Sequence, residues 1–309
     1  MKICITGGSG FVGMWFLKQA PKDFDCVVLS RSMKKSDVLN GKVIKTDYSY
    51  HGLKSIFEDQ SFDAVVHLAG KKIKEEFELL DYIRTNTLLT DKLLRLCVEL
   101  SVKNVVTASS RMVYSDENVL PWNESESPTP MTYYGLSKLL ADKLGLYYSN
   151  KHEIKCKSLR FAQIFGIDCG RNIIQTKLFR TFINKAIENR PLPIYGEGKD
   201  EKEYIYVKDA VNSIFSALKV PEEYGVFNIG LGEKKTVLNI AKSINDVFEN
   251  ENNGYKFLRN KEEKNESNLL DISKSEKVLN FDPTWNMKEA LVDMKEIIED
   301  GCVDVRTEE

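Results

Sequence analysis

Tyr134 and Lys138 are the residues of this sequence whose types and spacing are best suited to chemistry. They lie four positions apart, and residues i and i+4 share one face of a helix. A phenol with a pKa of about 10 is a poor base at neutral pH unless a nearby cation stabilises its phenolate. The pair could therefore exchange a proton with a substrate hydroxyl or carbonyl. The spacing alone is weak evidence, because it occurs by chance in many helices.

A glycine-rich turn opens the chain. The apolar run at residues 3–5 is followed by Gly7, Gly10 and Gly13, and then by a helical stretch that ends before Pro21. In a strand–turn–helix unit, such glycines let the backbone approach a pyrophosphate at the helix N-terminus. The spacing is Gly-x-x-Gly-x-x-Gly rather than Gly-x-Gly-x-x-Gly, and a glycine turn that binds nothing is the alternative. The position directly after the first strand favours a dinucleotide site.

Length and composition exclude several classes of protein. The chain has 309 residues, which suits one large α/β domain or two joined domains, and a net charge of −2, so no nucleic acid or membrane partner is expected. Six cysteines and three histidines show no metal-ligand spacing, so no metal is expected. No apolar stretch approaches ~20 residues and the first strand begins at Lys2, which predicts a cytoplasmic protein without a signal peptide. The run Lys71, Lys72 and Lys74, with acidic residues after it, is interpreted as a solvated helix face.

The order of predicted elements indicates a parallel sheet with helices on both faces. Strands are expected at residues 2–6, 26–29, 43–45, 64–68, 104–108 and 155–160, and long helices at 77–100 and 133–150. After residue 166 the alternation stops, with an edge strand near 191–196 and a charged loop at 249–267. Residues 1–165, with return segments near 205–230, should form the dinucleotide-binding domain. Residues 166–309 should form mainly a substrate lobe at the C-terminal edge of the sheet, where ligands bind.

Taken together, the ordered motifs resemble the extended short-chain dehydrogenase/reductases, and among them the NAD-dependent epimerase/dehydratase family, most closely its nucleotide-sugar 4-epimerase branch. The resemblance covers nearly the whole chain, and it implies a Rossmann-type doubly wound parallel sheet with a smaller C-terminal α/β lobe. It also implies a homodimer in which helices 77–100 and 133–150 pair across a two-fold axis. The motifs are residues 6–13 (TGGSGFVG), 66–70 (VHLAG), Asn86, Ser109-Ser110, 113–114 (VY), 134–138 (YGLSK), 159–160 (LR), 165–166 (FG), 204–209 (YIYVKD), 227–230 (FNIG), 271–274 (DISK) and 281–283 (FDP).

The resemblance assigns roles to individual residues. Tyr134 would be the general base that takes a proton from a sugar hydroxyl as hydride leaves for the nicotinamide. Lys138 would lower the phenol pKa and hold the nicotinamide ribose, and Ser110 would hydrogen-bond the reacting oxygen. In an epimerase the 4-keto sugar turns over and hydride returns to its other face. The implied cofactor contacts are Gly7, Gly10, Phe11, Val12, Gly13, Arg31, Asp47, Tyr48, Leu68, Ala69, Gly70, Asn86, Tyr134 and Lys138, and the implied substrate contacts are Ser110, Gln163, Leu192, Ile194, Tyr195 and Lys202.

Two departures from the family pattern narrow the reaction. Family dehydratases carry an Asp-Glu pair directly after the catalytic hydroxyl, whereas Arg111 and Met112 stand there in this chain. The branch that epimerises C3 and C5 has a cysteine at the position of Met112. Without the acid pair and the cysteine, 4,6-dehydration and epimerisation at C3 and C5 are not expected, which leaves simple 4-epimerisation or ketone reduction.

The residues expected to bind the cofactor and the substrate diphosphate also differ from the family pattern. The second strand ends in Ser30-Arg31-Ser32, with Lys34 and Lys35 following, where an NAD site usually has an acid and an arginine favours the 2′-phosphate of NADP. NAD and NADP both stay open, since Arg31 could instead stack on the adenine. Lys202 replaces an arginine that grips the substrate diphosphate in relatives, and lysine cannot make the same two-pronged contact. Gln163 stands where relatives often have asparagine, and a second family arginine has no counterpart at residues 261–267.

Three functions are compatible with these residues. The first is an NAD(P)-dependent nucleotide-sugar 4-epimerase of the UDP-hexose or UDP-N-acetylhexosamine type. The second is an NADPH-dependent reductase of a nucleotide 4-keto-sugar or another carbonyl. The third is a non-catalytic dinucleotide-sensing protein, although such proteins commonly lose the tyrosine that Tyr134 represents here. The sequence does not identify the sugar or its nucleotide.

Overall fold

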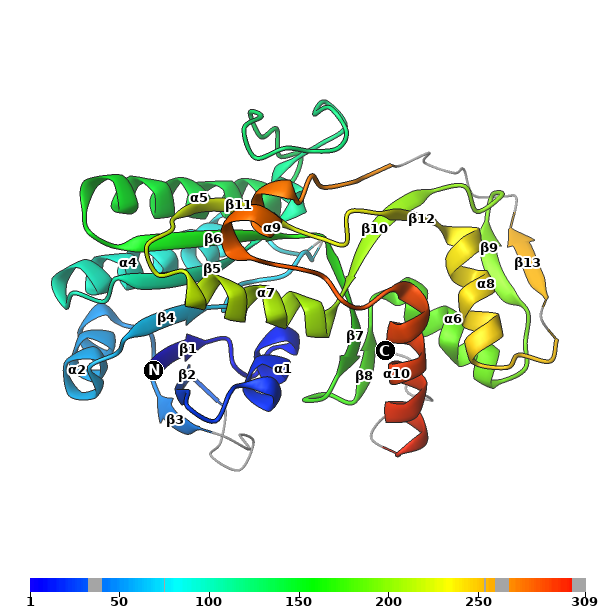
Figure 1. The fold of residues 1–309 in the computed structure, drawn as a ribbon, viewed down its shortest axis with the longest axis horizontal. Helices are drawn as coiled ribbons and strands as arrows, with labels where there is room; N and C mark the ends of the chain where they lie inside the picture. Colours follow the sequence, from blue (N-terminus) through cyan, green and yellow to red (C-terminus); the bar gives the residue numbers. More distant parts are fainter. Residues whose placement is uncertain (33–40, 75, 253, 259–266, 302–309) are drawn as a thin grey trace.

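A seven-stranded parallel sheet forms the centre of the larger lobe of the computed structural model, which describes residues 1–32, 41–74, 76–252, 254–258 and 267–301 (Figure 1). Its middle strands are apolar and buried on both faces, as parallel strands covered by helices must be. All six predicted strands are present, and a seventh joins from a later part of the chain. The strands, in sheet order, are β3 (Lys42–Lys45), β2 (Asp25–Ser30), β1 (Lys2–Thr6), β4 (Ala64–His67), β5 (Asn104–Ser110), β6 (Lys155–Phe161) and β11 (Gly225–Ile229).

Helices cover both faces of this sheet, so the predicted doubly wound arrangement is confirmed (Figure 1). One face packs against α1 (Phe11–Gln19) and α7 (Val207–Lys219), and the other against α2 (Tyr50–Gln60), α4 (Leu88–Glu99) and α5 (Tyr133–Lys151). Along β1, Ile3 and Ile5 enter the first core and Cys4 enters the second, because side chains alternate along a strand.

The helix predicted at residues 77–100 is divided into three parts. A short helix α3 (Leu79–Tyr82) leads into a π-helical turn (Ile83–Thr87), which leads into α4. Wide turns of this kind are frequent at functional sites. The turn carries Asn86, whose side-chain oxygen accepts from the Lys71 backbone N–H at 2.7 Å and whose amide donates to Ser137 Oγ at 3.0 Å. Asn86 thereby ties the loop after β4 to α5.

The smaller lobe lies beyond the C-terminal edge of the large sheet (Figure 1). A four-stranded sheet has the order β12-β10-β7-β8, and β9 pairs with β13. The predicted charged loop at 249–267 was wrong in part, because β13 lies inside it, while residues 253 and 259–266 are outside the described residues. The elements are β7 (Gln163–Asp168), β8 (Ile173–Gln175), α6 (Lys177–Ile187), β9 (Leu192–Tyr195), β10 (Glu201–Tyr206), β12 (Lys234–Thr236), α8 (Val237–Val247), β13 (Tyr255–Leu258) and α10 (Met287–Glu299), and α9 (Ser273–Leu279) packs against β11 of the larger lobe.

Across the described ranges, none of the helices combines the length and the apolar character needed to cross a bilayer.

Candidate active site

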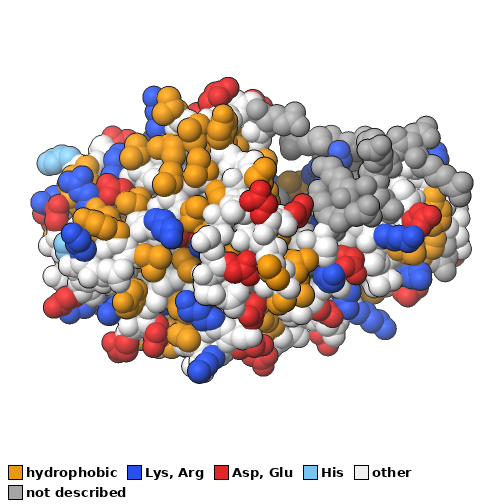
Figure 2. Space-filling model, turned by 90° about the horizontal axis from the view of Figure 1, so that it is seen from above, with side chains coloured by type: hydrophobic (Ala, Val, Ile, Leu, Met, Phe, Trp, Pro, Cys, Tyr) orange, Lys and Arg blue, Asp and Glu red, His pale blue; other side chains and the backbone are white. Residues whose placement is uncertain are grey.

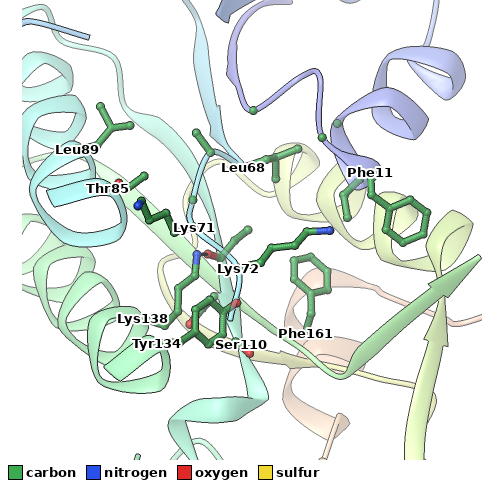
Figure 3. A pocket seen from close by; sticks show the side chains of 18 of the residues that line it. Phe11, Leu68, Lys71, Lys72, Thr85, Leu89, Ser110, Tyr134, Lys138 and Phe161 are labelled. Atoms are coloured by element: carbon green, nitrogen blue, oxygen red, sulfur yellow. Dashed lines mark hydrogen bonds between the residues drawn. The ribbon is translucent and has the colours of Figure 1, made fainter. Parts of the chain in front are cut away.

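A cavity of about 1040 Å³ lies at the carboxyl ends of the large sheet (Figure 3). Much of its lining comes from the segments that follow β1, β2, β3, β4, β5 and β6, and helices α4 and α5 add further side chains. Ligands of open parallel sheets bind at this edge, where the strand order reverses between β1 and β4. Every cofactor contact implied by the resemblance lines the cavity except Asn86, which is buried behind the loop that it holds.

The glycine turn after β1 is tight enough that side chains would not fit. Gly7 has φ +76°, and a Cβ placed there would lie 2.5 Å from the backbone nitrogen of Ala69. A Cβ on Gly13 would lie 2.3 Å from the carbonyl oxygen of Gly7. The first turn of α1 carries no acidic residue, so its free N–H groups and dipole face the cavity without competition. This cradle fits the pyrophosphate of a dinucleotide.

Helix α5 places Tyr134 and Lys138 at the inner end of the cavity (Figure 3). The helix begins where Thr132 Oγ1 accepts from the Gly135 backbone N–H at 3.0 Å. Lys138 is almost completely buried, and its Nζ donates to the Ala108 carbonyl at 2.8 Å. The same Nζ lies 5.9 Å from the centre of the Tyr134 ring. The expected pair is therefore on one face of α5, with the ammonium directed at β5.

The surroundings shift the pKa values of both groups. Burial raises the pKa of Tyr134, while the Ser110 hydroxyl and the Arg111 charge act in the opposite direction. Burial lowers the pKa of Lys138 to about 8, and the Asp142 carboxylate opposes this shift. The ammonium of Lys138 should therefore begin to lose its proton at mildly alkaline pH. That Lys138 lowers the phenol pKa stays a prediction for the liganded state.

Asp142 belongs to a buried network behind the catalytic helix. Its carboxylate accepts from Arg160 Nε at 2.9 Å, and Arg160 Nη1 donates to the Tyr114 hydroxyl at 2.7 Å. The Tyr114 hydroxyl in turn donates to Asn228 Oδ1 at 3.0 Å. This chain of contacts connects α5 to β6 and β11, and so holds the position of Lys138.

Two serines end β5 beside Tyr134. Ser110 Oγ accepts from the Met112 backbone N–H at 3.2 Å and begins a short 3-10 turn (Arg111–Val113). Ser109 Oγ is buried and has no hydrogen-bond partner among the described residues. Both serines line the cavity, so a bound ligand can meet one or both hydroxyls.

The cavity is strongly basic. Seven of its lining residues are lysine or arginine, whereas Asp47 is the acidic residue among those described there. Such a surface suits ligands that carry several phosphates. The cations are Arg31, Lys71, Lys72, Arg84, Lys92, Arg111 and Lys138.

The interpretation of Lys71, Lys72 and Lys74 as a helix face was wrong, because none of the three lies in a helix; Lys72 and Lys74 are solvent-exposed, as expected. All three stand in the irregular loop that follows β4, and Lys71 and Lys72 line the cavity. Lys72 extends between Phe11 and Phe161 (Figure 3), and desolvation followed by the charge of Arg171 lowers its pKa. Their position just after a buried parallel strand was the signal that could have found them.

The implied substrate contacts divide into two groups. Ser110 and Gln163 line the cavity, whereas Lys202 and the three residues of β9 do not appear in its lining. Leu192 and Ile194 are completely buried in the core of the smaller lobe, while Tyr195 is half-exposed. Contacts of β9 and Lys202 with a nucleotide stay predictions. The sequence reasoning missed Phe161, Gln175 and Thr176, which lie at or near strand ends and complete the wall toward the smaller lobe.

Comparisons with known proteins agree with this geometry. A UDP-N-acetylglucosamine 4-epimerase structure from Bacillus cereus is 31% identical, with 97% of this chain and 96% of that chain covered and a TM-score of 0.85. An uncharacterized UDP-glucose epimerase of Bacillus subtilis, YtcB, is 28% identical, with 94% and 96% covered. A UDP-glucuronate 4-epimerase of Thermodesulfobacterium geofontis is also 28% identical, with 93% of each chain covered. Residues 3–230 match the NAD dependent epimerase/dehydratase family, and the chain belongs to that family.

Proposed function

We propose that this protein is a nucleotide-sugar 4-epimerase that works through a 4-keto intermediate. The observation that carries the proposal is the convergence of Tyr134, Ser110 and Lys138 at the inner end of the basic cavity. The names of similar proteins support it, since they include 4-epimerases of UDP-N-acetylglucosamine and UDP-glucuronate. Arg111 and Met112, which replace the acid pair of dehydratases, agree with it.

The residues fit a nicotinamide dinucleotide. The glycine cradle would hold its pyrophosphate, and Lys138 with the loop after β4 would hold its nicotinamide half. When bound, this cofactor supplies the acceptor and donor of hydride at the sugar carbon. Tyr134 takes the proton of the C4 hydroxyl, and Ser110 holds the same oxygen by a hydrogen bond. After the keto sugar has turned, Tyr134 returns the proton to the new alcohol.

The charge of Lys138 favours the phenolate form of Tyr134 once a substrate fills the cavity. Water is displaced from the inner end at that stage, so the interaction between the two charges strengthens. Burial alone holds the phenol in its neutral form, because it raises the pKa of Tyr134. The proton transfer therefore depends on both cations beside the phenol, Lys138 and Arg111.

The test is direct detection of a C4 epimer. The purified chain is incubated with UDP-glucose, UDP-N-acetylglucosamine or UDP-glucuronate, and proton NMR follows the sugar. We expect a C4 epimer from at least one of them, with no solvent deuterium at C4, because the hydride stays within the enzyme. Dinucleotide binding without turnover of any nucleotide sugar or carbonyl would instead support the non-catalytic sensing protein.

An NADPH-dependent reductase is the second candidate. The observation that favours it is the cavity wall after β2, where Arg31 lines the site and the described residues 30–32 carry no carboxylate. A reductase consumes one NADPH for each carbonyl reduced and must exchange its cofactor. Stoichiometric loss of NADPH absorbance with a 4-keto nucleotide sugar, and no C4 epimer from any alcohol substrate, would replace the first proposal by this one.

We also propose that the protein forms a homodimer through α4 and α5. Hydrophobic side chains gather on the half of the molecule that contains α5 (Figure 2). Leu88 on α4 and Leu140 and Tyr147 on α5 are exposed, whereas Leu139 and Leu144 pack on the cores. Light scattering should give twice the monomer mass, and Leu140→Lys should halve it. A monomeric wild-type protein would contradict this proposal.

A further inference from the structure

The adenosine end of the cavity carries two cations whose function the proposed reaction does not explain. The dinucleotide of such a sheet runs from the reaction centre across the glycine turn, and its adenosine reaches the ends of β2 and β3. Arg31 follows β2 directly, and Lys92 reaches the same wall from α4. The inference that follows rests on the proposed function only for the identity of this cavity as a dinucleotide site.

Tyr48 organises this end of the cavity. It has φ +61°, a conformation that few non-glycine residues adopt, and its hydroxyl donates to the Leu29 carbonyl at 2.6 Å. Lys92 Nζ donates to the Tyr48 carbonyl at 3.3 Å. Burial raises the pKa of Tyr48 to about 12, while the charge of Arg31 acts against that shift. Arg31, Tyr48 and Lys92 therefore line the same cavity, and Tyr48 is held there by its contacts with Leu29 and Lys92.

The carboxylate of Asp47 does not take the place of the acid that binds a ribose 2′-hydroxyl. That acid normally ends the second strand, where this chain has Ser30. Asp47 instead follows β3, and its Oδ1 accepts from the Ser49 backbone N–H at 2.8 Å. The turn after β2 is closed by Ser32, whose backbone N–H donates to Ser30 Oγ at 3.3 Å. Residues 30–32, the described part of this segment, would offer an unmodified ribose no acidic partner, while Lys34 and Lys35 lie outside the described residues.

We infer that Arg31 and Lys92 bind the 2′-phosphate of an adenosine ribose, so that the cofactor of this protein is NADP(H) rather than NAD(H). A phosphate needs charged donors, and the planar guanidinium of Arg31 can donate to two of its oxygens at once. Lys92 adds a second charge from α4. Neither cation would have a comparable partner in NAD, whose ribose carries a neutral hydroxyl at that position.

The test compares the affinities of NADPH and NADH for the full-length protein by fluorescence titration. We expect wild-type protein to bind NADPH at least ~10-fold more tightly, since one charged hydrogen bond corresponds to about that factor. Arg31→Ala should weaken NADPH binding about 10- to 100-fold and leave NADH binding nearly unchanged. Lys92→Met should have a smaller effect in the same direction. Lys45→Ala removes an exposed cation of β3 outside the cavity lining, and serves as the control for general loss of charge.

A second variant tests the cofactor preference in the opposite direction. Ser30→Asp installs the acid that an NAD site would have, so it should reverse the preference toward NADH. Wild-type binding of NADH as tight as that of NADPH would overturn the inference. Equal weakening of both cofactors by Arg31→Ala would also overturn it, because a guanidinium that only stacks on adenine discriminates nothing. Binding of NADPH with no epimerase or reductase activity would refute the proposed function and leave the cofactor assignment intact.

Discussion

The two lobes contribute to the cavity in different ways. In the larger lobe, six parallel strands end at one edge, and each is followed at once by residues that line the cavity. In the smaller lobe, short strands form two separate sheets, and the lining comes from the start of β7, the end of β8 and Thr176 after it. The strand β9, which the resemblance assigns to the substrate, packs Leu192 and Ile194 in the core and leaves Tyr195 exposed.

The difference follows from how each lobe is built. A buried parallel strand has a fixed direction, so the residue after its end is placed at the ligand edge by local sequence alone. The strands of the smaller lobe run in mixed directions and receive their neighbours from distant segments, as β10 does from β12 and β7. Short contiguous motifs therefore locate the cavity-lining residues of the larger lobe, whereas no such motifs locate those of the smaller lobe.

The largest effect should come from the reaction centre of the larger lobe. Tyr134→Phe removes the proton acceptor and should lower kcat about 100- to 10,000-fold, with little change in dinucleotide affinity. Tyr147→Phe, on an exposed site of the same helix, is the matched control and should keep full activity. Turnover near the wild-type rate in Tyr134→Phe would show that the general-base assignment is wrong.

The second-largest effect should come from the buried network of Asp142 and Arg160 behind α5. Asp142→Asn breaks the buried pair with Arg160, so it should lower the free energy of unfolding by ~3–5 kcal/mol. Asp142 also raises the pKa of Lys138, which is about 8, so activity that needs the charged lysine should fall as pH rises through that value. In Asp142→Asn the fall should occur at lower pH.

A core variant of the smaller lobe separates the loss of stability from the shift in the pH–rate profile. Leu192→Ala should also destabilise, by ~2–5 kcal/mol, because it leaves a cavity in that core. Its pH–rate profile should match that of the wild type, since Leu192 does not face Lys138. An unshifted profile in Asp142→Asn would mean that the carboxylate acts only on stability.

Two glycines compare the tight dinucleotide cradle with a looser position after β7. Gly13→Ala would bring a methyl group within 2.3 Å of the Gly7 carbonyl, so we expect a loss of ~1–3 kcal/mol in stability and weaker dinucleotide binding. Gly170→Ala, beside β7, would meet the flexible side chain of Met14 at 3.2 Å and should change both quantities much less. Chemical denaturation and cofactor titration measure the two effects. Equal losses in both variants would show that the close approach at Gly13 is not what holds the cradle.

The smallest effect should come from Tyr195. If β9 contacts the nucleotide, Tyr195→Ala should raise KM about 5-fold at unchanged kcat, which corresponds to an aromatic contact of ~1 kcal/mol. Tyr224→Ala, a similarly exposed tyrosine before β11 of the larger lobe, should leave KM unchanged. An unchanged KM in Tyr195→Ala would remove β9 from the substrate site.

The sequence by itself determined the parallel sheet, the glycine cradle and the Tyr134–Lys138 pair. Each is a local pattern: an apolar run, a glycine spacing, or two residues one helical turn apart. These patterns were sufficient because burial and backbone sterics act over a few neighbouring residues. For the same reason the six predicted strands agree with the structure almost to their ends.

Only the tertiary structure decided which distant side chains share one space. It brought Lys72 and Lys92 to the cavity, placed Leu192 and Ile194 in a core, and set Asp142 between Lys138 and Arg160. It also turned part of the predicted helix at 77–100 into a π-helical turn around Asn86. Such placements depend on packing between segments far apart in the chain, where the charge and burial of one residue are set by neighbours that no local pattern contains.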